Sequence, residues 1–267
     1  VAKTVASSFG LSVERIELLG GYSNSILKLH PHPLVARVAT SAMRVSPVAE
    51  LVDKEVSVAR YLAEMNSDAV RPSKLVPAGP HIIDGLGLSF WEYVPDIEGS
   101  CSPVALGESL RRLHSDLAQC PTNLTLLSPL NEVWMFLEQA DFLDGVTMQA
   151  KVAILRVAER VRSGLEQRAL EVKPLHGDAH HGNLRLAPLG LTWFDFEDAC
   201  LGPIEWDLAA MVASSRVFGT GLAADEALAM LISKLDTIEE NIYRNIRRKI
   251  KAIDTLNDRD FTDWMKL

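Results

Sequence analysis

Three oxygen-bearing side chains near residue 180 have the types and the spacing needed for chemistry on a phosphate group. Asp178 and Asn183 lie five positions apart, and Asp195 follows Asn183 by twelve. Phosphoryl transfer needs a carboxylate that orients the attacking hydroxyl group, and oxygen ligands that hold magnesium against the phosphates. Magnesium prefers carboxylate and amide oxygens. Asn183 and Asp195 fit that preference, and each borders a short predicted strand that would hold it rigidly.

Two other interpretations of this segment stay open from the residues alone. In the first, the polar side chains His176, Asp178, His180 and His181 belong to a surface loop without a chemical role. In the second, the closely spaced His and Asp residues bind zinc or iron, as in a metal hydrolase. Such a hydrolase usually recruits histidines from distant loops, whereas His181 is the last histidine of the chain. The second interpretation is therefore the weaker one.

Composition limits the class of protein. The chain has 267 residues, of which 48% are hydrophobic and 23% charged, as in ordinary globular proteins. This length favours two lobes that share a cleft over one compact core. A formal net charge of -8 argues against nucleic acid as a partner, because phosphate backbones demand clustered positive charge.

The cellular location is expected to be the cytoplasm. The three cysteines are widely spaced, which indicates neither a disulfide framework nor a zinc ribbon. No apolar run approaches the roughly 20 residues that a membrane span needs, and the first residues do not resemble a signal peptide. We expect no membrane partner.

The first third of the sequence predicts strands and one helix. Apolar runs and turn-forming glycines indicate strands, namely two within 16–29 around Gly20-Gly21, and others at 34–39, 81–84 and 88–94. Ser46 and Pro47 predict an N-cap followed by proline at the first helical position. An apolar stripe continues this helix to about residue 65.

Helical periodicity dominates after Pro95. Helices are predicted around 106–117, 134–142 and 152–170 and again from about 205, with short strands at 173–175, 184–186 and 191–194. The sequence therefore predicts an α+β protein. Its N-terminal lobe, residues 1–94, contains an antiparallel sheet and a helix. A hinge at about 91–95 leads to a mainly helical C-terminal lobe, residues 95–267.

Three motifs resemble the aminoglycoside phosphotransferase and choline kinase superfamily. They are His-Gly-Asp-Ala-His-His-Gly-Asn at 176–183, Phe-Asp-Phe-Glu-Asp at 194–198 and Gly-Pro-Ile-Glu-Trp-Asp-Leu-Ala at 202–209. The resemblance covers most of the chain but is specific only between about 176 and 209. It implies a two-lobed protein-kinase-like fold and Mg²⁺-dependent transfer of the γ-phosphate of ATP, or of GTP, to a hydroxyl group of a small molecule.

The resemblance also implies roles for single residues of the catalytic loop. Asp178 would be the catalytic base, and Asn183 and Asp195 would ligate Mg²⁺. A structural supporting role for the loop is implied for three further residues, namely His176, His180 and Asp207. His181 stands where the superfamily more usually has proline.

On the nucleotide side, the superfamily has a cation on the third strand that pairs with a glutamate of the next helix. Arg37 occupies the cation's place, and Glu55 is the expected partner, with Glu50 as the alternative. The turn Gly-Gly-Tyr-Ser-Asn-Ser is similar to the superfamily's phosphate-covering turn. Ser23 in this turn would donate a hydrogen bond to a phosphate oxygen. The segment 88–94 resembles the hinge that meets adenine, through the main chain of Glu92 and Val94.

The acceptor cannot be named from the sequence, because acidic and basic residues nearly balance after Glu205. A nucleotide-binding pseudokinase that acts through partners is the alternative function. A protein kinase is disfavoured, because little chain lies between Asp198 and Gly202 to dock a polypeptide. His114 is expected to pack on its helix, and the basic run at 244–251 is expected to be a solvated helix face.

Overall fold

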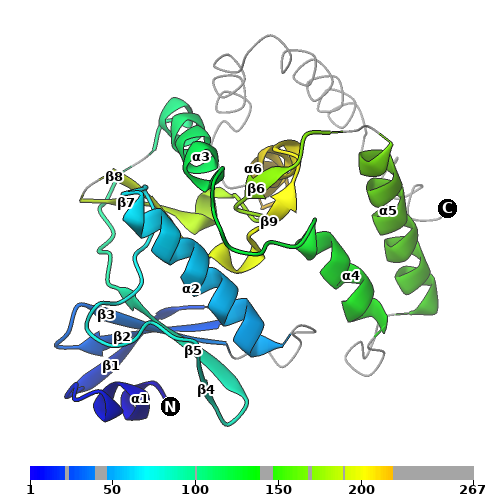
Figure 1. Cartoon of the computed structure of the whole chain (residues 1–267). Helices are drawn as coiled ribbons and strands as arrows, with labels where there is room; N and C mark the ends of the chain where they lie inside the picture. Colours follow the sequence, from blue (N-terminus) through cyan, green and yellow to red (C-terminus); the bar gives the residue numbers. More distant parts are fainter. Residues whose placement is uncertain are drawn as a thin grey trace.

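The protein is described here by a computed structural model, in which residues 1–21, 24–39, 47–99, 101–138, 147–167, 170–188 and 190–218 are described. A five-stranded antiparallel sheet comes first, in the order β1-β2-β3-β5-β4 (Figure 1). Its strands are β1 (Arg15–Gly20), β2 (Asn24–His30), β3 (Leu34–Ala39), β4 (His81–Ile83) and β5 (Leu86–Glu92). Two helices belong to this part of the chain, α1 (Ala2–Ser8) and α2 (Val48–Glu64).

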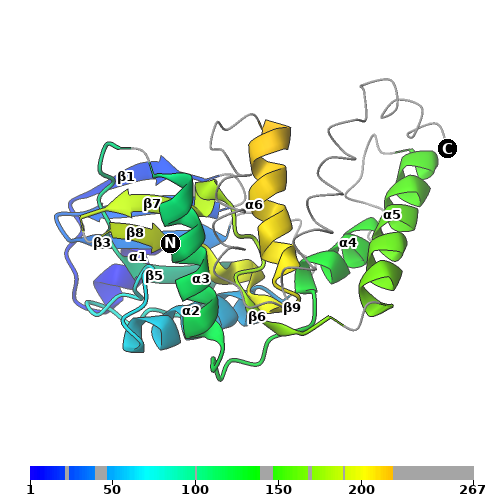
Figure 2. The ribbon, with the colours of Figure 1, turned by 90° about the horizontal axis from the view of Figure 1, so that it is seen from above.

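The rest of the described chain is mainly helical. Its helices are α3 (Pro103–Leu117), α4 (Ser128–Glu138), α5 (Met148–Glu166) and α6 (Glu205–Phe218). Two small antiparallel pairs lie among them, β6 (Lys173–Leu175) with β9 (Cys200–Gly202), and β7 (Leu184–Ala187) with β8 (Gly190–Trp193). The sheet lies at one end of the molecule, and α4 and α5 lie at the other (Figures 1 and 2).

Strand β3 is buried along its whole length. Successive side chains of a strand point to opposite faces of the sheet. Leu34, Ala36 and Val38 accordingly enter the apolar cluster that contains α1. Val35 enters the cluster that contains α2. The same alternation directs Arg37 toward α2, and this explains how a cation comes to lie on an otherwise apolar strand.

Two details at the helices differ from the sequence-based expectations. Helix α2 begins at Val48, and Pro47 is its N-cap residue rather than its first helical residue. Proline's missing N–H costs little at either place, because the first amides of a helix have no partner within it. Helix α1 was not expected. Its seven residues are too few for a clear apolar period, and its burial against the sheet stabilises it.

One apolar core joins the sheet side to the helical side. It contains Val56 of α2, Leu110 of α3 and Leu208 of α6, together with Trp193 and Phe196 from the segment after β7. The lobes can therefore not pack independently of each other. No helix within the described ranges is both long and apolar enough to cross a membrane.

Candidate active site

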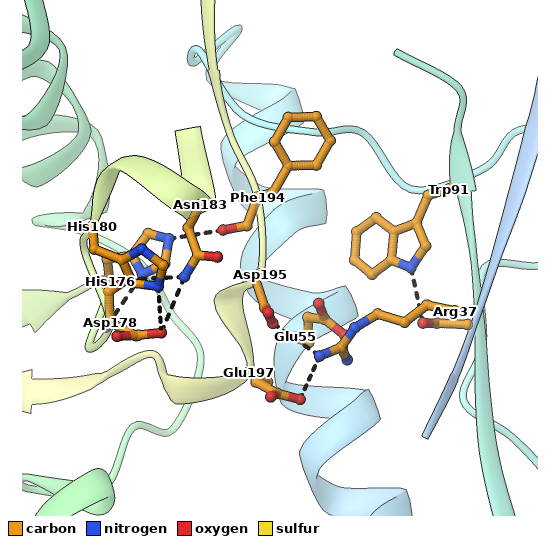
Figure 3. A network of polar contacts seen from close by, with 11 residues as sticks. Arg37, Glu55, Trp91, His176, Asp178, His180, Asn183, Phe194, Asp195 and Glu197 are labelled. Atoms are coloured by element: carbon orange, nitrogen blue, oxygen red, sulfur yellow. Dashed lines mark hydrogen bonds and ion pairs between the residues drawn. The ribbon is translucent and has the colours of Figure 1, made fainter. Parts of the chain in front are cut away.

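The loop between β6 and β7 brings Asp178 and Asn183 together (Figure 3). The Asn183 side-chain amide donates to the Asp178 carbonyl oxygen at 3.0 Å and to its carboxylate Oδ2 at 3.1 Å. The main chain of Asn183 also accepts from the amide of Phe194 at 2.8 Å. This bond places the loop beside the residue that precedes Asp195. The three side chains that the sequence singled out therefore lie at one place.

His176 holds this loop from inside the protein. Its side chain is fully buried, and its ring lies against Trp193 and Phe196. Nδ1 accepts from the Asp178 amide at 3.3 Å, so Nε2 carries the proton and donates to the Phe194 carbonyl at 2.9 Å. His176 thus bonds to the main chain of Asp178 and to that of Phe194, the residue before Asp195.

Asp207 holds the loop from α6. Its carboxylate is fully buried and accepts from the amides of His176 at 3.0 Å and Gly177 at 2.9 Å. The third donor is His114 Nε2 of α3, at 2.8 Å. From the sequence, His114 was expected only to pack on its helix. Its position four residues after the buried Leu110 was the available signal, since such residues share a helix face.

The charge of Asp178 is stabilised by a neighbouring histidine. Burial alone would raise the pKa of Asp178, but the hydrogen bond and charge of His180 outweigh burial and lower it. The hydrogen bond to Asp178 likewise raises the pKa of His180. Nε2 of His180 lies 3.3 Å from Asp178 Oδ2. A low pKa makes Asp178 a carboxylate at neutral pH, suited to orient a hydroxyl group.

Asp195 has an unusual backbone conformation, with φ of 63°. Few residues other than glycine adopt this left-handed region, and Asp is among those that tolerate it. The turn carries the Asp195 side chain into the cleft, beside the guanidinium of Arg37 (Figure 3). Burial raises the pKa of Asp195, Arg37 opposes that change, and the nearby Glu197 adds to it.

Arg37 meets three carboxylates at once. Nη1 donates to Glu55 at 2.7 Å, and Nη2 donates to Asp195 at 2.8 Å and to Glu197 at 2.5 Å. Burial works to lower the pKa of Arg37, but the three carboxylates outweigh burial and raise it. The Arg37 side chain is almost fully buried. Its charge and those of the carboxylates are therefore stable in this cluster only because they pair with one another.

The structure answers which glutamate meets Arg37. Glu55 is buried on the inner face of α2, whereas Glu50 is exposed in the first turn of the helix. Glu197 is a contact of Arg37 that the sequence-based analysis missed. Its only signal was its place two residues after Asp195, and nothing local indicated that it would reach β3.

A cleft of about 710 Å³, counting its open mouth, lies between the sheet and the β7–β8 hairpin. Arg37, Asn183 and Asp195 line one part of it. Its walls are otherwise largely apolar, with Ile26, Val35 and Phe194 among them. Two expected nucleotide contacts, Glu92 and Val94, also line the cleft. The third, Ser23, lies outside the described residues.

The donor set of this site fits magnesium better than zinc. Asn183 and Asp195 offer an amide and a carboxylate oxygen, and Mg²⁺ usually binds one or two protein oxygens together with waters and substrate phosphates. Within the described part of the chain, no three His, Cys, Asp or Glu side chains form a metal-binding group. The described residues therefore give no support to a zinc or iron hydrolase.

Several other carboxylates lie near Asp198. Burial raises the pKa of Asp198 to about 7, and the charges of Glu197, Glu132 and Asp178 add to this effect. Two of these residues, Glu132 on α4 and Asp178, lie outside the lining of the cleft. The surroundings of Asp198 thus disfavour further negative charge.

Comparison with known proteins agrees with this geometry. A family model described as a phosphotransferase enzyme family matches residues 14–238. Thiamine kinases of Escherichia coli (strain K12) and of Shigella flexneri are 29% identical to this chain over 203 residues. The match includes 73% of this chain and 66% of the length of each thiamine kinase, just under two thirds.

Solved structures share the fold. An amicoumacin kinase in complex with AMP-PNP, Ca²⁺ and its antibiotic has a TM-score of 0.65 at 14% identity, over 91% of this chain and 77% of that one. An aminoglycoside phosphotransferase of Streptomyces rimosus has a TM-score of 0.64 at 17% identity, over 90% and 94%. The expected α+β, protein-kinase-like fold is confirmed.

Proposed function

This chain belongs to the phosphotransferase enzyme family, and on that premise we propose that it transfers the γ-phosphate of ATP or GTP to a hydroxyl group of a small molecule. The family resemblance expected from the sequence is confirmed. One observation carries the proposal. The hydrogen bonds of Asn183 join it to Asp178, and Asn183 and Asp195 line the same cleft. These are the groups that phosphoryl transfer needs at one place.

Each side chain has a distinct task in the proposed reaction. Asp178, whose pKa is lowered against the effect of burial chiefly by His180, orients the acceptor hydroxyl and receives its proton. Asn183 and Asp195 would hold Mg²⁺, which neutralises charge that develops on the transferred phosphate. Three hydrogen bonds from main-chain amides fix the loop: Asp207 accepts from His176, His176 Nδ1 accepts from Asp178, and His180 Nδ1 accepts from Gly182 at 3.0 Å. These contacts support the roles without testing them.

The nucleotide is proposed to occupy the cleft with its phosphates toward Arg37 and Asp195. Arg37, paired with Glu55, contributes positive charge at that end. Glu92 and Val94 line the cleft and are proposed to meet the base through their main chain. Ser23 is proposed to donate to a phosphate. We propose residues 1–94 as the nucleotide-binding lobe, 91–95 as the hinge and 95–267 as the lobe that binds the acceptor.

The acceptor is proposed to carry positive charge. Besides burial, which is the largest cause, the charges of neighbouring carboxylates, Glu132 and Asp178 among them, raise the pKa of Asp198, and a cationic group beside Asp198 would relieve that repulsion. The thiamine kinases are similar to this chain, so thiamine is one of the compounds to test. No disulfide joins any of the three cysteines, and a reducing compartment such as the cytoplasm is the proposed location.

A screen of acceptors tests the proposal directly. Transfer of labelled γ-phosphate from ATP or GTP is measured in the presence of Mg²⁺ over aminoglycosides, choline, thiamine and sugars. With a true acceptor, Asp178→Asn is expected to lower kcat about a hundredfold or more and to leave ATP binding intact. Asp195→Asn is expected to weaken Mg²⁺-dependent ATP binding as well.

Asp84→Asn is the matched control for both variants. Asp84 is exposed in the turn between β4 and β5, with φ of 53°, a conformation that Asn accepts as readily as Asp. Full turnover by Asp195→Asn at the same Mg²⁺ requirement would refute the metal assignment. Tight ATP binding without transfer to any acceptor would favour the pseudokinase alternative, which no present observation supports.

A further inference from the structure

The cleft wall opposite the sheet contains a charged residue, Arg185 of β7. Alternation along the strand explains its direction, because the preceding Leu184 packs against the main apolar core. Arg185 consequently faces the cleft, beside Phe194. Among the described residues that line this wall, the other polar ones are Asn183 and Asp195, so Arg185 is a charged residue that the proposed metal site does not explain.

Arg185 lies away from the metal-binding part of the cleft. Asn183 comes two residues earlier, and a strand rises about 3.3 Å per residue. The next residue, Leu186, accepts a hydrogen bond from the Ile97 amide at 3.0 Å. Arg185 therefore lies toward the segment after β5. If the phosphates and Mg²⁺ bind at Asn183 and Asp195, the part of the nucleotide beside Arg185 is the base or the sugar.

The guanidinium of Arg185 lies over an aromatic ring. Its central carbon lies 5.0 Å from the centre of the Phe194 ring, and Nη1 lies 3.5 Å from Asp96 Oδ1. A planar guanidinium that lies against one aromatic ring can present its other face to a second. The ion pair with Asp96 is long, and both partners are exposed, so it contributes little to stability.

We propose that Arg185 forms the floor of the base subsite and that its guanidinium stacks on the purine ring of the bound nucleotide. This inference rests on the proposed function and adds a base-binding residue to it. The aliphatic side chains Ile26 and Val35 from the sheet would cover the opposite face of the ring. Purines are favoured over pyrimidines, because the larger ring has more surface to stack.

Equilibrium binding to separate parts of the nucleotide tests the proposal without turnover. Adenosine, ATP and inorganic tripolyphosphate are titrated into the wild-type protein and into Arg185→Leu and Arg185→Lys, in a calorimeter. Leucine keeps an apolar side chain but loses the cation, and lysine keeps the charge but loses the plane. Both variants are expected to bind adenosine and ATP about three- to tenfold more weakly, with unchanged affinity for tripolyphosphate.

Arg112→Leu is the matched control. Arg112 is also an exposed arginine with one carboxylate partner, Asp68 at 2.9 Å, and it lies outside the cleft lining. Its substitution is expected to change none of the three affinities. Far-UV circular dichroism and the melting temperature verify that each variant is folded. The variants are expected to fold, because the side chains of Arg112 and Arg185 are exposed.

The outcomes separate this inference from the proposed function. If the wild type binds ATP and both Arg185 variants bind adenosine as tightly as the wild type does, Arg185 only forms a surface ion pair and the inference is wrong. Weaker tripolyphosphate binding with unchanged adenosine binding would make Arg185 a phosphate contact, which also overturns it. A wild-type protein that binds no purine nucleotide at all would refute the proposed function and this inference together.

Discussion

Arg37 shows at the residue scale why arginine and lysine are not equivalent at this site. Its guanidinium is planar and presents several N–H groups in fixed directions. Nη1 and Nη2 therefore reach carboxylates of α2 and of the segment after β8 at the same time. A lysine ammonium at the end of a flexible chain cannot satisfy all three from one buried place.

Substitution of Arg37 tests this view. Arg37→Met should lower the free energy of unfolding by about 3–5 kcal/mol, because it leaves buried carboxylates without their cation. Arg37→Lys should lower it by roughly half as much, since the charge stays and the fork is lost. Urea unfolding measures both. Arg112→Met, at an exposed pair, should cost less than about 1 kcal/mol, and an equal loss there would contradict the argument.

Asp198 provides a pH-dependent prediction. Its pKa is about 7 in the folded protein, against about 4 in an unfolded chain. The folded state therefore holds the proton more strongly, so the contribution of Asp198 to stability is present below about pH 4 and is lost as pH rises toward 7.

Asp198→Asn removes this dependence. The free energy of unfolding is measured in urea without Mg²⁺ or nucleotide. The value for the variant minus the value for the wild type should be about 1–3 kcal/mol larger at pH 8 than at pH 5. Asp84→Asn, the same change at an exposed turn, is the control. A gain at pH 5 as large as that at pH 8 would show that Asp198 does not hold its proton in the folded state.

At the scale of elements, the site depends on a tight meeting of the catalytic loop with η3 (Phe196–Asp198). Gly177 has φ of +88°, and a Cβ atom there would lie 1.8 Å from the Asp198 carbonyl oxygen. Its amide donates to Asp207, and its carbonyl accepts from the Trp206 indole at 2.8 Å. The N–H and C=O groups of Gly177, which belong to two successive peptide bonds, are therefore both hydrogen-bonded, directly before Asp178.

Gly177→Ala should consequently impair both stability and activity. The added methyl group must push the loop away from η3, at a cost of about 3 kcal/mol or more, and kcat should fall because Asp178 moves with the loop. Thermal unfolding and turnover measure the two effects. Gly164→Ala is the control, because Gly164 lies in α5 with open space around it. That change should stabilise the helix by about 0.5–1 kcal/mol.

At the scale of the whole molecule, the site spans two parts of the protein that one core unites. Arg37 and Glu55 come from β3 and α2, whereas Asp195 directly precedes η3 and Glu197 lies within it. The ion pairs thus cross the cleft that would bind the nucleotide. A ligand in this cleft contacts both sides, and it should stabilise the folded state as a unit.

Nucleotide binding should therefore raise the melting temperature. At a concentration of Mg²⁺-ATP about 100 times its Kd, the stabilisation is about 2.7 kcal/mol, which corresponds to roughly 5–10 °C for a chain of this size. Differential scanning fluorimetry measures the shift. EDTA and Asp195→Asn should each reduce it strongly. An equal shift with EDTA present would mean that the metal does not take part in binding.

Much of the fold followed from local pattern. Strands β3 and β6 have the predicted bounds. Both could be predicted because each is a short run between residues that break a strand, and such a pattern is local to the sequence. The approach of Asp178 to Asn183 was also predictable, since they lie five positions apart in one loop. Their chemical roles, and those of Asp195 and His180, stay predictions that the proposed variants will test.

The pairing partners were decided by the tertiary structure. Arg37 meets Asp195 and Glu197 across separations of 158 and 160 residues, and His114 meets Asp207 across 93. The period of a helix or strand sets which face a side chain occupies, as it did for Glu55. It does not set which distant element packs on that face, because that depends on the path of the whole chain and on how the buried charges neutralise one another.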